Sequence, residues 1–308
     1  MQLDDFADRV LKPRISQLAS SIDADVANAY KGIYQSVGTP GTTPATSLVL
    51  LQAQQKLNEA AAISSPRYAT VNAAANAALV EGMKGLFNPV STISKQFKSG
   101  LMGEGILGYE ELGMSQSIKQ HTVGTIPTGI QISTTVTSEG ASSLVLKFSS
   151  QNYAFNVGDV FAVGSVYSVN PQTRESTGSL QQFVVTAAVS GSSATSATVS
   201  VAPAIYTSAH ALATVDSLPL ANATVTFLGS SATQYAQNLV YHKDAITFAT
   251  ADLLLPQGVD MASRQVHNGI SLRVVRQYDI NNDRMPCRID VLYGYGVIRP
   301  EMAVRLWG

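Results

Sequence analysis

The feature of this sequence that most restricts its fold is a hairpin pattern close to the C-terminus. Asn268-Gly269 is the dipeptide that best supplies the two positive φ angles of a two-residue hairpin turn. β-favouring, alternating residues follow it from 270 to 275. A turn-rich segment, Asp279 to Pro286, separates them from a second run, Arg288 to Tyr293. The sequence therefore predicts paired β-strands over this part of the chain.

The composition suits a surface that is covered repeatedly by copies of itself, although many monomeric β proteins share it. The 308 residues are 45% hydrophobic and 13% charged, against about 25% charged in an average soluble domain. Ser, Thr, Asn and Gln then supply most of the polar surface, and they cost less to desolvate than ions. The formal net charge of −1 gives no electrostatic signal for nucleic acid or for an anionic membrane.

The lack of a disulfide framework, a membrane span and a signal peptide in the sequence indicates where the chain is made and used. Cys287 is the one cysteine, so an internal disulfide is excluded and a reducing compartment is favoured. No apolar run reaches the ~18 residues of a membrane span, and the N-terminus carries no basic-then-apolar signal peptide. We expect the chain to be made and used in the cytoplasm, at least until it leaves the cell as part of a larger assembly.

The N-terminal region is predicted to form one long helix from Asp4 to about Tyr34, because apolar residues recur on one face. Pro13 lies inside this pattern, so we expect a kink there or a helix that begins near it. A solvated surface helix is the alternative, but the length without internal glycine favours a spine against which other elements pack. The candidate packing residues are Phe6, Val10, Leu18, Ile22, Val26 and Tyr30.

Between this helix and about residue 117 the pattern is mixed. We expect Thr43 to cap a helix that has Pro44 at its first position and runs to about Ala62. The remaining expectations are a strand from Arg67 to Val71, a helix capped by Asn72 and ending near Gly85, a short helix from Ser91 to Lys98, and an irregular, glycine-rich stretch from Ser99 to Gly113.

From Thr122 to about Gln234 the composition changes to Ser, Thr, Val, Ala and Gly. Short alternating runs separated by turn residues predict a small β-barrel or sandwich. The runs are 143–148, 159–163, 182–186, 197–201 and 223–227, and 190–196 is expected to be an exposed loop tip. Because helical patterns precede this segment and a different pattern follows it, we interpret it as a domain inserted into another domain.

No group of residues predicts an active site. Gly103 to Gly108 matches G-x-G-x-x-G without the strand and helix that a dinucleotide site needs, so a loop is favoured. Asp279 to Asp283 imitates a calcium loop, but Arg284 stands where glycine is required, and Asx-turns explain these residues more simply. The four histidines are scattered, and the usual state of a lone cysteine such as Cys287 is a buried, unreactive one. We therefore expect no enzyme activity, metal or cofactor.

Arginines gather towards the C-terminus. Those on the predicted strands are Arg273, Arg276 and Arg288, and Arg284, Arg299 and Arg305 lie nearby. Charged strand faces are usually just solvated, but arginines also pair with carboxylates of a neighbouring subunit. Both interpretations stay open from the sequence.

Three blocks of sequence resemble one family. They are Leu3–Asp25, Asn72–Phe87 with Met83-Lys-Gly-Leu-Phe87, and His242–Tyr293 with Pro256-Gln-Gly-Val-Asp260. Segments 158–161 and 176–185 add to them, so the resemblance covers most of the chain. The sequence resembles the P22-type coat proteins, the major capsid proteins of short-tailed phages.

The resemblance implies the HK97-type capsid fold, an α+β architecture with a long spine helix, here with an inserted all-β barrel. It implies residues 1–36 as the spine helix of a peripheral domain, 37–117 as the first part of an axial domain, 118–235 as the inserted domain, 236–265 as the axial return, and 266–308 as the C-terminal hairpin and peripheral strands. It further implies hexamers and pentamers in an icosahedral virion shell, enclosing double-stranded DNA without sequence-specific contact. The expected partners are scaffolding and portal proteins and, as a further candidate, a cementing protein. A β-rich tail or carbohydrate-binding protein is the alternative.

Relatives carry an N-terminal arm and an extended loop before the spine helix, whereas this sequence starts at the helix. We expect the role of that loop to be absent or relocated. The low-charge stretch from Ser117 to Gln151 is the candidate for an extended loop that reaches a neighbouring subunit.

Overall fold

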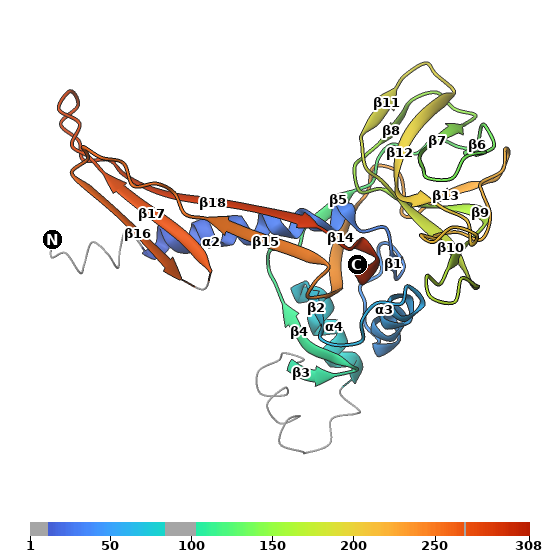
Figure 1. Cartoon of the computed structure of the whole chain (residues 1–308), viewed down its shortest axis with the longest axis horizontal. Coiled ribbons are helices and arrows are strands. Elements are labelled where there is room, and N and C mark those ends of the chain that lie inside the picture. The colour runs from blue at the N-terminus through green and yellow to red at the C-terminus, as the bar shows by residue number, and fades with distance from the viewer. Residues whose placement is uncertain (1–11, 84–102, 268) are drawn as a thin grey trace. The chain divides into compact units, whose positions relative to one another are not determined.

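The computed structural model describes residues 12–83, 103–267 and 269–308 (Figure 1). Helices and strands both contribute, so the expected mixed class is confirmed. The chain divides into two compact units. The small unit contains residues up to 26 together with 247–296, and the large unit contains 27–246 together with 297–308. We describe each by itself.

The small unit combines one helix with a four-stranded sheet. Helix α2 (Lys12–Val26) runs along β18 (Cys287–Val297), and Tyr293 Oη donates to Asp25 Oδ2 at 2.9 Å (Figure 1). The sheet has the order β15 (Ile246–Ala251), β18, β17 (Ile270–Arg276), β16 (Met261–His267). His267 pairs with Ile270, so the expected pairing of strands on either side of Asn268-Gly269 is confirmed, while Asn268 itself lies outside the described residues.

The expected single helix from Asp4 to Tyr34 is wrong in its second half. α2 ends at Val26, and a 3₁₀ helix, η2 (Ala27–Gly32), follows it as part of the large unit. The reason is tertiary: Ala29, Tyr30 and Ile33 are buried in the large unit, and the tighter 3₁₀ turn orients them inward. Residues before 12, which include Phe6 and Val10, lie outside the described part of the chain.

A seven-stranded sheet forms the core of the large unit. Its order is β1 (Ser36–Val37), β19 (Ala303–Trp307), β14 (Gln234–His242), β2 (Arg67–Val71), β4 (Tyr109–Met114), β3 (Gly103–Ile106), and β5 (Gln120–Thr122) pairs with β14. Helices α3 (Ser47–Glu59) and α4 (Ala73–Met83) contribute to the same core. Leu50, Ala53 and Leu57 of α3 are fully buried at helical spacing, and each such leucine contributes about 1.5–3 kcal/mol.

Of four expectations for this region, two are confirmed, one is wrong in its bounds, and one falls on residues outside the described part of the chain. The strand from Arg67 to Val71 and the Asn72 cap are confirmed, since Asn72 Oδ1 accepts a hydrogen bond from Ala75 N at 2.8 Å. The helix expected from Pro44 begins instead at Ser47, with Thr46 as its N-cap residue, and ends at Glu59. The helix expected over 91–98 lies outside the described residues.

The glycine-rich stretch from 99 to 113 is not an irregular loop where it is described. It forms the hairpin β3–β4, in which Ile106 pairs with Tyr109. Leu107 and Gly108 supply the positive φ angles of the turn, 52° and 77°. Tyr109 and Leu112 are buried in the core, which fixes the register of β4.

The β-rich segment of the large unit forms a six-stranded sheet. The order is β13 (Val225–Phe227), β9 (Val160–Val169), β10 (Ser176–Val185), β12 (Ser196–Ile205), β7 (Ala141–Lys147), β6 (Gln131–Ile132). Its two edges meet, because Val225 N donates to Ile130 O at 3.0 Å and Ile132 N donates to Ala223 O at 2.9 Å. The strands expected from the alternating runs are therefore confirmed, and the sheet closes into a barrel around its own core.

Two smaller strands complete this segment. β8 (Tyr153–Phe155) pairs with β11 (Val189–Gly191), so the loop tip expected over 190–196 begins only after Gly191. The stretch from 118 to 151, the candidate for an extended intersubunit loop, contributes β5, β6 and β7 to the large unit. Ile130, Ile132, Leu144 and Leu146 from it are buried in the barrel core. Its contact with a neighbouring subunit stays a prediction.

Candidate assembly surfaces

The chemistry-bearing residues do not converge on one site. Among the described residues, no three His, Cys, Asp or Glu side chains come close enough to hold a metal ion. Asp279 Oδ1 accepts from Asn281 N at 3.0 Å, the Asx-turn that the sequence predicted in place of a calcium loop. Cys287 is exposed, against the expectation of burial, because it stands at the start of β18 next to a turn.

The strand arginines of the small unit pair within their own sheet. Arg273 donates through Nε to Asp290 Oδ2 at 3.2 Å, and Arg288 pairs with the other oxygen of the same carboxylate. Arg276 lies 3.1 Å from Asp260. The hydrogen bond from Arg273 is the main cause that lowers the pKa of Asp290. These three arginines therefore have carboxylate partners in their own chain, so pairing with a neighbouring subunit is not required to neutralise them.

The loop between β15 and β16 is held by the same face of the sheet. Arg273 Nη1 donates to Leu254 O at 2.6 Å, and Arg264 Nη1 donates to Leu253 O at 3.4 Å. Arg264 also lies 3.5 Å from Asp252. Leu254 nevertheless points its side chain outward, with 85% of its surface exposed. We call residues 253–256 the leucine loop.

The predicted packing stripe of the N-terminal helix is only partly buried. Ile22 is 6% exposed, whereas Leu18 and Val26 are half-buried. Tyr30 is buried, but in the large unit. Large apolar side chains elsewhere in the small unit are also open to solvent, among them Ile280 at 81%, Val266 at 56% and Leu292 at 49%. These side chains are candidates for contact with a partner, because apolar groups gain stability when they are removed from water.

A buried polar cluster ties the barrel to the core of the large unit. Asp159 at the start of β9 accepts from His121 Nε2 at 2.8 Å and from the backbone of Gly124 and Asn156. His121 Nδ1 lies 3.2 Å from Tyr30 Oη. The His121 and Asp159 side chains are 3% and 0% exposed. Such a network is strong only when every member has its partner.

Arg305 extends this cluster into the core sheet. Its guanidinium donates to Ile33 O at 2.9 Å and to Gly158 O at 2.8 Å, and it lies over the rings of Tyr30 and Trp307. Burial lowers the pKa of Arg305, with Tyr30 and Asp159 opposing the shift, but arginine stays positively charged in proteins. Sequence analysis missed this role. The signal was a single arginine inside the apolar strand Ala303–Trp307.

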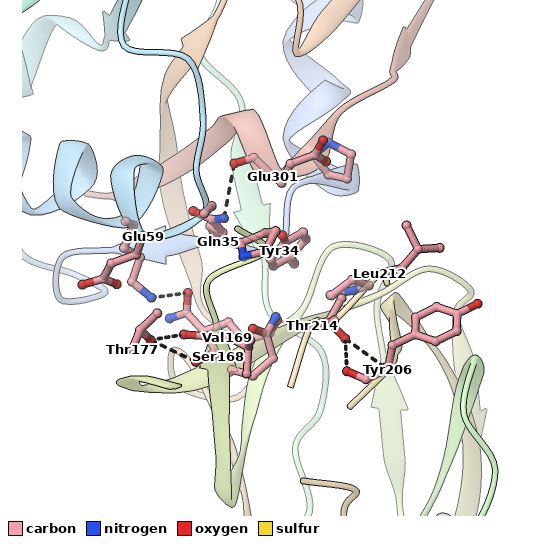
Figure 2. Close-up of a pocket in the computed structure, with 18 of the residues that line it drawn as sticks. Tyr34, Gln35, Glu59, Ser168, Val169, Thr177, Tyr206, Leu212, Thr214 and Glu301 are labelled. Carbon is pink, nitrogen blue, oxygen red and sulfur yellow. Dashed lines mark hydrogen bonds between the residues drawn. The ribbon is translucent and has the colours of Figure 1, made fainter. Parts of the chain in front are cut away.

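A pocket of about 360 Å³ lies where the barrel meets the core elements of the large unit. Figure 2 shows Gln35 and Glu59 entering it from the core and Thr177, Leu212 and Thr214 entering it from the barrel. Lys56 Nζ donates to Gln182 Oε1 at 3.0 Å. Burial lowers the pKa of Lys56, and the nearby carboxylate of Glu59 acts in the opposite direction by favouring the charged form. Leu180 and Leu212, which also line the pocket, are 41% and 64% exposed.

None of the helices in the described parts of the chain combines the length and the apolarity needed to cross a membrane. The described surface has exposed apolar side chains on the small unit and a pocket on the large one. Both are features suited to protein contacts.

No curated protein matches the chain. A solved structure from Mycobacterium phage Che8 is similar, with 10% identity and a TM-score of 0.40, over 98% of this chain and 66% of that one. The chain thus spans slightly less than two thirds of the length of that structure. The family model described as P22 coat protein, gene protein 5, matches residues 2–308. Since this match covers nearly the whole sequence, the chain belongs to the P22 coat protein family.

Proposed function

We propose that this protein is the shell-forming subunit of a tailed-phage capsid, which assembles with copies of itself into hexamers and pentamers of an icosahedral virion shell. The observation that carries the proposal is the family match over residues 2–308. The exposed apolar side chains of the small unit and the 13% charged composition support it, because such surfaces are covered at low desolvation cost.

The parts of the chain have distinct roles in this proposal. The small unit, with α2 and the long strands β17 and β18, corresponds to a peripheral domain with its spine helix. The seven-stranded sheet with α3 and α4 corresponds to the axial domain around the capsomer axes. The barrel is the inserted domain, and the Asp159–Arg305 cluster fixes it on the axial core. In this proposal the division follows the HK97-type arrangement, and the boundaries expected from the sequence at residues 36, 117, 235 and 265 stay predictions.

The proposed assembly takes place in the host cytoplasm, and the partners are those of a shell. The protein itself is the main one, and scaffolding, portal and cementing proteins are the others. Packaged double-stranded DNA lies inside without sequence-specific contact. The subunit carries out no reaction in this proposal. A β-rich tail or carbohydrate-binding role fits the barrel alone and leaves the rest of the family match unexplained.

Sedimentation velocity of the purified, tag-free protein tests the proposal. We expect species far larger than the 32.5 kDa chain, from capsomers to closed shells, in a protein-concentration-dependent distribution. A single monomeric boundary at all concentrations, with and without a co-expressed scaffolding protein, would contradict self-assembly.

A further inference from the structure

We propose that the leucine loop (residues 253–256) of one subunit docks into the barrel–core pocket of a second copy of this chain. This inference rests on the proposed shell function and specifies one of its subunit contacts. It starts from the loop, which is firmly held and yet exposes an apolar side chain.

The leucine loop is held by two arginines that lie opposite each other in the sheet and donate hydrogen bonds to its carbonyl groups. Arg264 of β16 and Arg273 of β17 stand directly opposite each other in the strand register, an arrangement that repulsion destabilises. Asp252 and Asp290 neutralise them. Their remaining donors bind the carbonyls of Leu253 and Leu254. The main chain of the loop is thus fixed by hydrogen bonds from charged donors, which are stronger than neutral ones.

The fixed main chain presents leucine side chains to solvent. Leu254 is 85% exposed and Leu255 is 46% exposed. Pro256 restricts Leu255 to an extended conformation. A segment whose main chain is already held before binding loses less conformational freedom when a partner covers it. The loop has the properties of a preorganised anchor, and anchors of this kind carry much of the affinity of an interface.

The absence of net charge on the leucine loop restricts the kind of surface that can bind it. Residues 253–258, Leu-Leu-Leu-Pro-Gln-Gly, contain no charged side chain, and the guanidinium groups beneath them are already paired. A charged receptor would be desolvated without compensation. The matching surface must therefore be concave and apolar, and its charges must be balanced within itself.

The barrel–core pocket meets these conditions. Leu180, Leu212, Pro171 and Pro203 are among its lining residues. Among the lining residues Lys56 is the one cation, and it already binds Gln182 and lies beside Glu59. With Glu301 also present, carboxylates outnumber the ammonium, so an anion is disfavoured. The volume of about 360 Å³ is at the small end for ligand sites, about 300–1,000 Å³, and suits a few side chains.

The pocket also holds an unused acceptor. Gln35 Oε1 is buried and has no hydrogen-bond partner among the described groups, although Gln35 Nε2 donates to Glu301 O at 3.3 Å. Buried polar atoms in native proteins are normally satisfied by water or by a bound group. A backbone N–H of an entering peptide segment would supply that partner after a small shift of the amide.

Anchor and receptor lie on different units of the chain, so a contact between copies joins unlike surfaces. Contacts of this head-to-tail type generate closed rings or extended arrays. A ring of subunits is what a hexamer or a pentamer requires. A self-complementary contact would instead stop at a dimer.

The test is a disulfide between two singly substituted chains, both carrying Cys287→Ser to remove the native exposed thiol. One chain carries Leu254→Cys and the other Leu212→Cys, and the two are co-assembled and oxidised. Because the cysteines are on different chains, any disulfide between the two variants is intermolecular. We expect a crosslinked dimer that is prominent in the assembled fraction and absent from the unassembled one.

Two matched controls have nearly the same exposure. Leu220→Cys replaces Leu212→Cys, since both leucines are 64% exposed and Leu220 does not line the pocket. Ile280→Cys replaces Leu254→Cys, at 81% against 85% exposure. Neither control pair should crosslink.

The outcomes separate the two proposals. Particles that form without the 254–212 crosslink, or with equal crosslinking in the controls, overturn the docking contact and leave the shell function standing. If none of the variants nor the parent chain assembles, the proposed function fails and the contact fails with it.

Discussion

Replacing Asp159 by asparagine would leave a side chain of nearly the same shape in a site built for a carboxylate. The two oxygens of Asp159 accept from His121 Nε2 at 2.8 Å, Asn156 N at 2.7 Å and Gly124 N at 3.2 Å. The amide group of asparagine offers a single acceptor oxygen. Its NH₂ group must therefore face at least one N–H donor, and the positive charge of Arg305 loses a nearby compensating anion.

The size of the effect follows from these contacts. A hydrogen bond to a charged group contributes about 1.5–3 kcal/mol, and breaking a buried charged pair costs about 3–5 kcal/mol. We expect the Asp159→Asn variant to lose about 3–5 kcal/mol of a total stability that is about 5–15 kcal/mol in typical proteins. For a unit of this size that loss lowers Tm by about 6–20 °C.

The assay is thermal and urea unfolding followed by near-ultraviolet circular dichroism, with Glu175→Gln as control. Glu175 is an exposed carboxylate on the same barrel, so that variant should change Tm by less than about 2 °C. If Asp159→Asn does not fold, Tyr30→Phe removes a single bond, Tyr30 Oη to His121 Nδ1, and should cost about 1 kcal/mol. An Asp159→Asn variant as stable as the control would show that the cluster does not hold the barrel on the core.

Three further predictions concern the other parts of the chain. Ile22→Asp should destabilise the small unit and reduce particle yield, whereas Ile15→Asp at 37% exposure should have little effect; equal particle yields would show that the Ile22 face of α2 is not a packing face. Hydrogen bonding lowers the pKa of Asp290 below its ordinary 3.8, so its contribution is present above that pH and is lost as pH falls through the folded pKa. The hydrogen-exchange protection factors of β17 and β18 should therefore fall in that acidic window in the parent, and this pH dependence should be absent in Asp290→Asn. An identical pH profile of the protection factors in both proteins would contradict this role of Asp290. Residues 118–235 expressed alone should unfold cooperatively, because the barrel closes on its own core. A disordered amide spectrum would show that the barrel needs the packing of Val160 and Val184 with Trp307, which the fragment lacks.

Local patterns carried most of what the sequence predicted correctly. The barrel strands were predictable because alternation along a strand depends on neighbours one or two residues away, as in 143–148, which lies over β7. The pairing of β16 with β17 and the Asn72 cap are likewise set within a few residues. Alternation alone does not define how these elements are arranged.

The errors arose where distant residues decide the local structure. α2 ends at Val26 because Tyr30 contacts His121, 91 positions away in the sequence. The glycines of 103–113 predict a loop, but Gly108 lies in the turn between β3 and β4. β4 also pairs with β2, which is distant in the sequence. The Asp159–Arg305 cluster was invisible for the same reason, since Arg305 and Gly158 are 147 positions apart.

The extended-loop hypothesis for 117–151 stays a prediction. The low charge of that stretch has a local cause as well, because its apolar residues Ile132, Leu144 and Leu146 are buried in the barrel. The segment with exposed apolar side chains on a fixed main chain is the leucine loop at 253–256, which the sequence did not single out.

Electron microscopy of the purified protein, alone and with a co-expressed scaffolding protein, tests the central claim most directly. The account predicts closed shells or capsomers with five- and six-fold symmetry, in which the small unit of each subunit contacts neighbouring subunits. Isolated 32.5 kDa particles, or slender trimers of the tail-fibre type under both conditions, would contradict it.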